Sequence, residues 1–248
     1  MNRMIDSKSV YPYSIDEAKR CGEIKDYSKS HQLNTACTKA IEKAIKANFD
    51  GFHLNCETAK SVIDEYGYDR PMWVLANTLQ YLKGDGRFSK ANSKWAETIY
   101  IPHTKIGNYD SSYGFIVNSH PAVLDGFVSQ TLKEYKSLGL YSSDYCIVDS
   151  NSQDYTGKIL VLRPYILKDE YKNSNNQLIL AQHGFGCSPT AIGRKVFGVY
   201  LLDGEKCQFN RLNFIGILKD EHITEWAKEK IANLNIPEES IENSLNMS

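Results

Sequence analysis

The sequence lacks paired cysteines, long hydrophobic runs and a large excess of charge of either sign. Its six cysteines are scattered singly over 248 residues, and none forms a CxxC pair. That distribution is typical of reduced thiols rather than of a disulfide framework. No apolar run reaches the length of a membrane-spanning helix, and the start, MNRMIDSKSVYPYS, has no apolar signal core. We therefore expect a cytoplasmic protein with no membrane segment.

Standard cofactor and catalytic motifs are missing as well. The stretch HGFGCSPTAIGRK, residues 183–195, begins like a dinucleotide fingerprint, but Pro189 occupies the third glycine position. Ser188 stands where a phosphate-binding P-loop requires its first glycine. HExxH, DxDxDG and GxSxG patterns occur nowhere. We expect no cofactor, no metal and no catalytic residues, and we interpret the glycines of this stretch as turn formers.

Cys187 keeps two chemical alternatives open. His183 lies four residues before it, a spacing that allows a thiolate–imidazolium pair. The same two residues and Cys207 could supply part of a zinc site, although structural zinc commonly takes four ligands. A small buried cysteine beside a turn is the commoner arrangement. A cysteine-dependent enzyme therefore stays an alternative function.

The hydrophobic pattern that is present changes its period along the chain. Before residue 100, apolar positions recur at helical spacing, as in TACTKAIEKAI, and Ser14 with Glu17 forms a capping-box pattern. After residue 158, short apolar runs alternate with turns, and Asp203-Gly204 predicts a tight hairpin. The sequence predicts an α+β protein, with an N-terminal helical bundle followed by a small, mainly antiparallel β-domain with a C-terminal helix.

The same pattern sets the expected boundaries. We expect a helical domain over 1–100, a connecting strand–helix–loop region over 101–157, a small α+β domain over 158–234 and a frayed polar tail over 235–248. In the connecting region, YGFIVNS is predicted to be a strand, HPAVLDGFVSQTLKEYKSLG a helix and YSSDYCIVDSNSQDYTG a loop.

Basic and aromatic residues gather in the third region. Residues 158–219 carry nine Lys/Arg and four Asp/Glu, a net charge of +5, although the whole chain has a net charge of −1. Interleaved Arg and aromatic side chains form protein interfaces or stack nucleic-acid bases. Alternatively, the aromatics form the core while the charges face water. The candidate binding residues are Arg163, Phe185, Arg194, Lys195, Lys206 and Arg211.

Several longer segments carry a family resemblance. They are YPYSIDEAKRCGEIKDYSKSHQLNTACTKAIEKAI, FDGFHLN, VLANTLQ, DGRFS, VNSHPAVLDGFVSQ and GFGCSPTAIGRKVFGVYLLDGEKCQFNR. Together they resemble an uncharacterised domain family carried by conjugative elements and phages of Gram-positive gut bacteria. The family has no assigned reaction, so no catalytic residue is carried over.

The resemblance implies a setting, because proteins of such elements often counter host defences. We therefore expect a non-enzymatic anti-defence protein, of the anti-CRISPR or antirestriction type, that binds and blocks a host effector protein or protein–nucleic acid complex. A nucleic-acid-binding accessory protein of the mobile element is the main alternative, because of the +5 segment.

Overall fold

The computed structural model of the protein describes residues 5–102, 105–106, 109–110, 114–148, 152–190 and 194–234. The predicted polar tail, 235–248, lies outside these residues. The chain divides into two compact units, Met1–Ser137 and Leu138–Ser248. We call them the helical unit and the sheet unit. None of the helices within the described ranges combines the length and apolar character needed to cross a bilayer.

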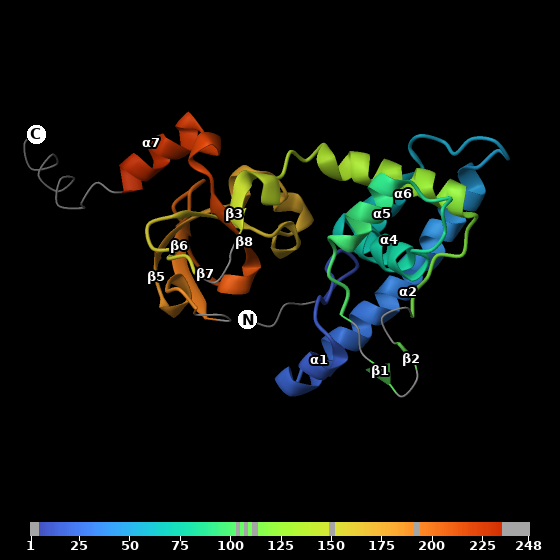
Figure 1. Cartoon of the computed structure of the whole chain (residues 1–248), viewed down its shortest axis with the longest axis horizontal. Helices are drawn as coiled ribbons and strands as arrows, with labels where there is room; N and C mark the ends of the chain where they lie inside the picture. The colour runs from blue at the N-terminus through green and yellow to red at the C-terminus, as the bar shows by residue number, and fades with distance from the viewer. Residues whose placement is uncertain are drawn as a thin grey trace, which may run out of the picture. The chain divides into compact units, whose positions relative to one another are not determined.

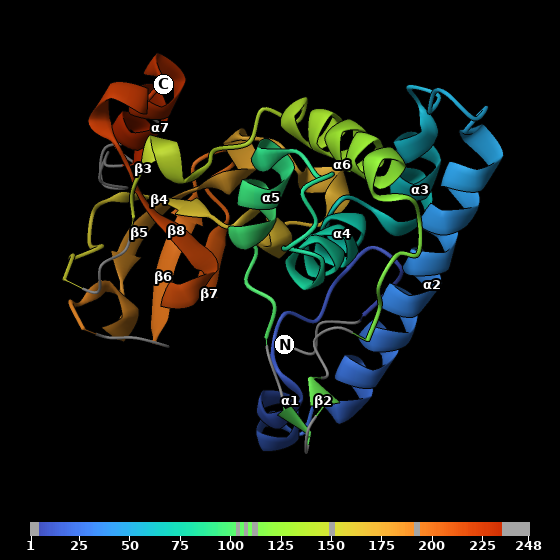
Figure 2. The ribbon, with the colours of Figure 1, turned by 45° about the vertical axis from the view of Figure 1, so that its right-hand side comes forward.

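The helical unit is organised around one central helix. Its helices are α1 (Ile15–Cys21), α2 (Ile24–Asn48), α3 (Thr58–Tyr66), α4 (Asp69–Tyr81), α5 (Lys90–Glu97) and α6 (Pro121–Lys136), and the short strands β1 (Lys105–Ile106) and β2 (Tyr109–Asp110) pair as a hairpin. Helix α4 packs against α2, α3, α5 and α6 (Figure 2). Its interior is almost wholly buried. Pro71 lies in its first turn, where a missing amide donor costs little.

The capping box predicted at the start of α1 forms only in part. The Ser14 hydroxyl accepts a hydrogen bond from the Glu17 amide at 3.2 Å and caps α1. The Glu17 carboxylate instead accepts from the Arg20 guanidinium and the Cys21 thiol. The hydroxyl half of the capping box is therefore confirmed, while the Glu17 carboxylate bonds other side chains of α1.

The strand predicted at YGFIVNS is wrong, because residues 114–119 contain no strand. The Val117 amide donates to the Thr78 hydroxyl at 3.2 Å, and the Asn118 amide donates to the Glu42 carboxylate at 2.6 Å. Phe115 and Val117 are buried in the helical core. The apolar run fills that core as an extended loop, because side chains of α4 and α2 satisfy its backbone donors.

The sheet unit is a six-stranded antiparallel sheet followed by a helix, which confirms the α+β prediction. Its strands are β3 (Cys146–Val148), β4 (Ile159–Leu162), β5 (Leu178–His183), β6 (Lys195–Tyr200), β7 (Lys206–Asn210) and β8 (Phe214–Leu218), and the helix is α7 (Glu225–Leu234). The strand order is β3-β8-β4-β5-β6-β7, and Figure 1 labels all of these strands except β4. Strand β3 lies in the segment predicted to be a loop, which is therefore wrong at these three residues.

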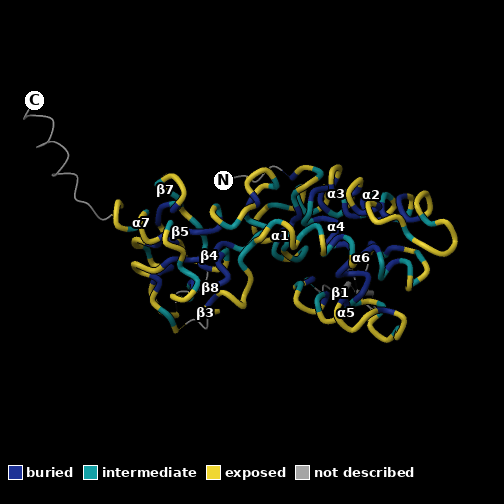
Figure 3. The backbone as a smooth tube through the Cα atoms, turned by 90° about the horizontal axis from the view of Figure 1, so that it is seen from above, coloured by how far each residue is buried: buried dark blue, intermediate teal, exposed yellow. Residues whose placement is uncertain are grey.

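Each face of the sheet buries its own hydrophobic cluster. Leu180 and Val199 pair across β5 and β6 and pack in the cluster that includes Ala227 of α7. The opposite face buries Ile179 and Val196 under loop residues such as Tyr155. Buried residues accordingly run along β4 and β5 (Figure 3). Two-sided burial explains why these strands read as continuous apolar runs.

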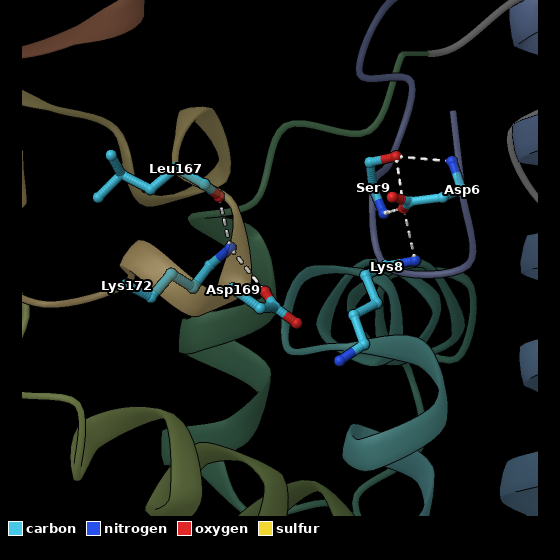
Figure 4. A network of polar contacts seen from close by, with 6 residues as sticks. All are labelled: Asp6, Lys8, Ser9, Leu167, Asp169 and Lys172. Carbon is cyan, nitrogen blue, oxygen red and sulfur yellow. Dashed lines mark hydrogen bonds and ion pairs between the residues drawn. The ribbon is translucent and has the colours of Figure 1, made fainter. Parts of the chain in front are cut away.

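The connection between β4 and β5 is held by a buried lysine. The Lys172 ammonium donates to the Leu167 carbonyl and to the Asp169 carboxylate, each at 2.9 Å (Figure 4). Its side chain is 1% exposed. The carboxylate offsets the cost of burying the charge, so this pair fixes the short 3-10 turns of the connection.

Candidate functional site

Phe185 is a strongly exposed aromatic among the predicted binding residues. It begins a 3-10 turn, Phe185–Cys187, that directly follows β5, and it is 83% exposed. Arg194 and Lys195, at the start of β6, are also exposed. The turn contacts β6, so the fold brings these three residues together.

Two glycines allow the turn to lie directly on β6. A Cβ at Gly184 would be 2.5 Å from the Lys195 carbonyl oxygen and 2.9 Å from the Phe197 ring, and its φ of 117° is one that other residues rarely adopt. A Cβ at Gly186 would be 2.5 Å from the Arg194 carbonyl oxygen. The glycines are therefore turn formers, as predicted, and they also permit this close approach.

A stacked ring pair continues the exposed region. His183 pairs with Phe197 across β5 and β6, and their rings stack with centroids 5.0 Å apart and planes 16° from parallel. In the same register Gln208 lies opposite Phe197, and Lys206 lies opposite Val199. Paired residues share one face of a sheet, and here it is the face that α7 covers at Val199. The part of this face that α7 does not cover is exposed to solvent.

We call the combined region the aromatic–basic surface. Its members are His183, Phe185, Arg194, Lys195, Phe197 and Lys206, all of which are exposed. Within the described ranges no carboxylate lies at ion-pair distance from Arg194, Lys195 or Lys206. The three cations are therefore available to an acidic partner.

Arg211 is a predicted binding residue that the structure places in the interior. It is 0% exposed, and its guanidinium donates to the carbonyls of Gly186 at 2.8 Å, Ser188 at 3.0 Å and Gln153 at 2.8 Å. Its Cζ lies 3.8 Å from the centroid of the Tyr155 ring, a cation–π contact. Arg211 therefore supports the turn from beneath and does not reach the aromatic–basic surface.

Arg163 is also apart from that surface. Its half-buried side chain donates to the Leu212 carbonyl at 3.1 Å. It follows β4, which is separated from β6 by β5 in the strand order. Four of the six predicted residues therefore belong to the surface.

The geometry separates Cys187 from His183. Cys187 is buried in the cluster that contains Val196, whereas His183 stacks on Phe197. Val196 and Phe197 are adjacent on β6 and therefore point to opposite faces of the sheet. The thiol beside Val196 and the imidazole on Phe197 accordingly lie on different sides of the sheet. Burial raises the pKa of the Cys187 thiol, which opposes thiolate formation. This arrangement does not support the cysteine-enzyme alternative, and no three metal-ligating side chains cluster in the described part of the chain.

Sequence reasoning did not count His183 or Phe197 among the binding residues. His183 was considered only beside Cys187, as a thiolate partner or a zinc ligand, and Phe197 was left open between a binding aromatic and a core aromatic. The Asp203-Gly204 turn could have revealed the role of Phe197, because it sets the β6–β7 register and puts Phe197 and Lys195 on one face. The bulge between Ala181 and His183 is not visible in the sequence, yet it sets the pairing of His183 with Phe197.

Gly186→Ala tests the close approach of the turn. We expect the added Cβ to force the turn away from β6 and to destabilise the sheet unit by about 1–3 kcal/mol, as overpacking does. Thermal unfolding monitored by circular dichroism measures the change. Gly84→Ala is the control, because its Cβ would meet nothing within 4 Å. Equal stability of the two variants would contradict the tight packing of the turn.

The fold is that of an α+β protein with separate helical and sheet units. The family model described as "Protein of unknown function (DUF3849)" matches residues 10–136, slightly more than half of the 248-residue chain, and the chain belongs to this family. This confirms the resemblance to an uncharacterised domain family. Searches of curated proteins and of solved structures gave no match. The matched residues lie within the helical unit, so the aromatic–basic surface lies outside them.

Proposed function

We propose that this protein is a non-enzymatic binding protein of a mobile genetic element that counters host defence by occupying the surface of a host effector complex. The observation that carries the proposal is Phe185, which is 83% exposed on a glycine-dependent turn beside Arg194 and Lys195. An exposed aromatic on a fixed turn is preordered for binding, so little conformational entropy is lost on association. Aromatic and arginine side chains are also the commonest interface anchors.

The charge of the surface selects the kind of partner. Three exposed cations share this surface with exposed rings, so the complementary face is acidic. An acidic protein surface and the phosphates of a protein–nucleic acid complex both meet that requirement. Nucleic acid alone is the second candidate, favoured by the stacked His183–Phe197 pair, because exposed rings beside cations stack bases.

A plasmid-cleavage assay tests the proposal against a panel of purified restriction and CRISPR nucleases. We expect inhibition of one of them to saturate near one protein per effector complex, because an occupied surface is a stoichiometric event. Inactivation at far lower ratios would indicate an enzyme instead. A gel-shift series on DNA and RNA at increasing salt tests the second candidate, nucleic acid alone, since affinity from phosphate contacts falls steeply with salt.

Phe185→Ala should weaken inhibition by about 30-fold, because a central aromatic anchor contributes about 2 kcal/mol or more. Lys195→Glu should weaken it further at low salt, where charge complementarity matters most. Tyr171→Ala is the matched control, since Tyr171 is another exposed aromatic of the sheet unit, outside the aromatic–basic surface. An unchanged inhibition constant for Phe185→Ala would remove this surface from the proposal.

A further inference from the structure

The chain that follows α7 has the charge opposite to that of the aromatic–basic surface. Residues 235–248, NIPEESIENSLNMS, carry the carboxylates of Glu238, Glu239 and Glu242 and no lysine or arginine. We call residues 235–248 the acidic segment; they lie outside the described ranges. The aromatic–basic surface holds three cations with no carboxylate at ion-pair distance among the described residues. The two are complementary in charge.

The end of α7 sets where the acidic segment begins. Leu234 is the last residue of α7, and its Cδ2 lies 3.6 Å from the position that a Cβ at Gly204 would occupy. Gly204 lies in the turn between β6 and β7, and Lys206 is the first residue of β7. The acidic segment therefore starts beside the end of the aromatic–basic surface that carries Lys206.

The hydrophobic core holds α7 in that place. Ala227 is buried in one cluster with Val199 of β6, and Trp226 and Ile231 pack against the same cluster. Moving the helix off the sheet would expose these side chains to water, which burial of apolar area opposes. The starting point of the acidic segment is therefore fixed on the face of the sheet to which Lys206 belongs.

The aromatic–basic surface extends from this starting point along that face. Lys206 lies opposite Val199, and Phe197 and Lys195 follow Val199 along β6 at intervals of two residues, on the same face. Four residues of a strand span about 13 Å. The cations at the two ends of this row are therefore separated by a distance of that order.

The acidic segment is long enough to reach both ends of the row. Glu238 follows Leu234 by four residues and Glu242 by eight. An extended chain spans at most about 3.6 Å per residue, so these residues reach up to about 14 Å and about 29 Å from Leu234. The first distance covers Lys206, and the second covers Lys195.

The order of charges along the acidic segment also matches the order along the face. Asp203 and Glu205 are exposed at the β6–β7 turn, beside Leu234, and they would repel carboxylates placed directly after α7. Residues 235–237 carry no charge, and the glutamates begin at Glu238. Uncharged residues thus come first, next to the acidic turn, and glutamates follow at the distance of the basic face.

We propose that the acidic segment docks on the aromatic–basic surface of its own chain, with its glutamates paired to Lys206, Lys195 and Arg194, and competes there with the acidic partner. A tethered segment has an effective concentration in the millimolar range, so weak exposed ion pairs suffice. A partner must displace the segment, which lowers its apparent affinity. The competition rests on the proposed function, whereas the contact itself does not.

Carbodiimide cross-linking of the full chain tests the contact without any partner. The reagent joins a carboxylate to an amine in direct contact, with loss of water, and peptide mass spectrometry identifies the joined residues. We expect cross-links from Glu238, Glu239 or Glu242 to Lys195 or Lys206. Their yield should fall at high salt, which screens exposed ion pairs.

Three results would overturn the contact. The first is the absence of cross-links from the acidic segment. The second is a preference of the segment for other exposed lysines of the sheet unit, such as Lys158 and Lys168. The third comes from an equal mixture of ¹⁵N-labelled and unlabelled chains: cross-links between chains of different label would place the segment on a second copy.

Fluorescein-labelled poly-L-glutamate is the acidic probe that tests the competition. The variant E238Q/E239Q/E242Q should bind it about three- to tenfold more tightly than the unmodified chain, the gain expected if the segment covers the surface in about two-thirds to nine-tenths of the chains. The matched control changes the net charge equally at three exposed glutamates elsewhere, and it should gain less than about twofold: Glu97→Gln, Glu170→Gln and Glu221→Gln.

Equal gains in the two triple variants would show that net charge alone acts and would overturn the competition. Failure of the proposed function gives a different result from failure of the contact. Cross-links without inhibition of any effector in the plasmid-cleavage assay leave the contact standing and remove the proposed function. Inhibition without cross-links removes the contact alone.

Discussion

Arg211→Met is expected to destabilise the sheet unit by about 3–4 kcal/mol, because hydrogen bonds to buried charged groups are strong and their loss leaves acceptors unpaired. The guanidinium bonds the carbonyls of Gly186, Ser188 and Gln153 from beneath the Phe185 turn. Methionine fills much of the volume but donates to none of them. Hydrogen exchange of the β5 and β6 amides measures the loss of stability in the sheet unit separately from the helical unit.

Arg163→Met is the matched control, because the Arg163 side chain makes one hydrogen bond to the described residues, to the Leu212 carbonyl, from a half-exposed position. Its substitution should cost less than about 1 kcal/mol. Arg211→Lys should recover only part of the stability, since a single ammonium cannot span carbonyls that a planar fork reaches together. Similar exchange protection in Arg211→Met and Arg163→Met would show that the turn is held by other contacts.

These two arginines mark the limit of prediction from the sequence. Both stand among aromatic residues in the basic segment, and both were predicted to bind a partner. Arg211 is buried because the chain crosses from β7 to β8 in a 3-10 turn, Arg211–Asn213, whose start is fixed by the Arg211 amide bonding the Arg194 carbonyl at 2.9 Å. No local pattern announces that crossing. Burial of a charged side chain depends on which carbonyls the fold brings around it.

The secondary structure was easier to predict than the site. Apolar runs such as ILVL of β4 and the helical spacing of α6 are local signals, and both elements are confirmed. The strand predicted at YGFIVNS and the loop predicted at the β3 residues were wrong for opposite reasons. The first has its backbone donors bonded by side chains of another segment, and the second pairs with β8, which lies about 70 residues away in the chain.

The helical unit contains a small, partly enclosed cavity of about 40 Å³ that was not predictable from the sequence. Tyr11, His31, Trp73 and Phe115 lie in four separate segments, and each reads as an ordinary amphipathic or core position. Only the folded chain reveals that the Arg70 guanidinium bonds the Asn34 amide oxygen beside it. Such a site depends on contacts between distant residues, which periodicity does not record.

Arg70 ties the N-terminal segment to the helical core. Its guanidinium, 0% exposed, donates to the carbonyls of Asp6 at 3.0 Å, Ser7 at 2.6 Å and Ser9, and to the Ser30 carbonyl of α2 at 3.0 Å. Asp6 shapes the same segment, since its carboxylate accepts from the Lys8 and Ser9 amides at 2.9 Å and 2.8 Å (Figure 4). Burial lowers the pKa of Arg70 to about 10, so the side chain stays charged at neutral pH.

Arg70→Met should therefore release the N-terminal segment and destabilise the helical unit by about 3–4 kcal/mol. Limited proteolysis before α1 and hydrogen exchange of α2 measure the release. Arg87→Met is the control, since Asp85 is the one partner of its exposed guanidinium within the described ranges. Unchanged proteolysis before α1 in Arg70→Met would mean that other contacts hold the N-terminal segment.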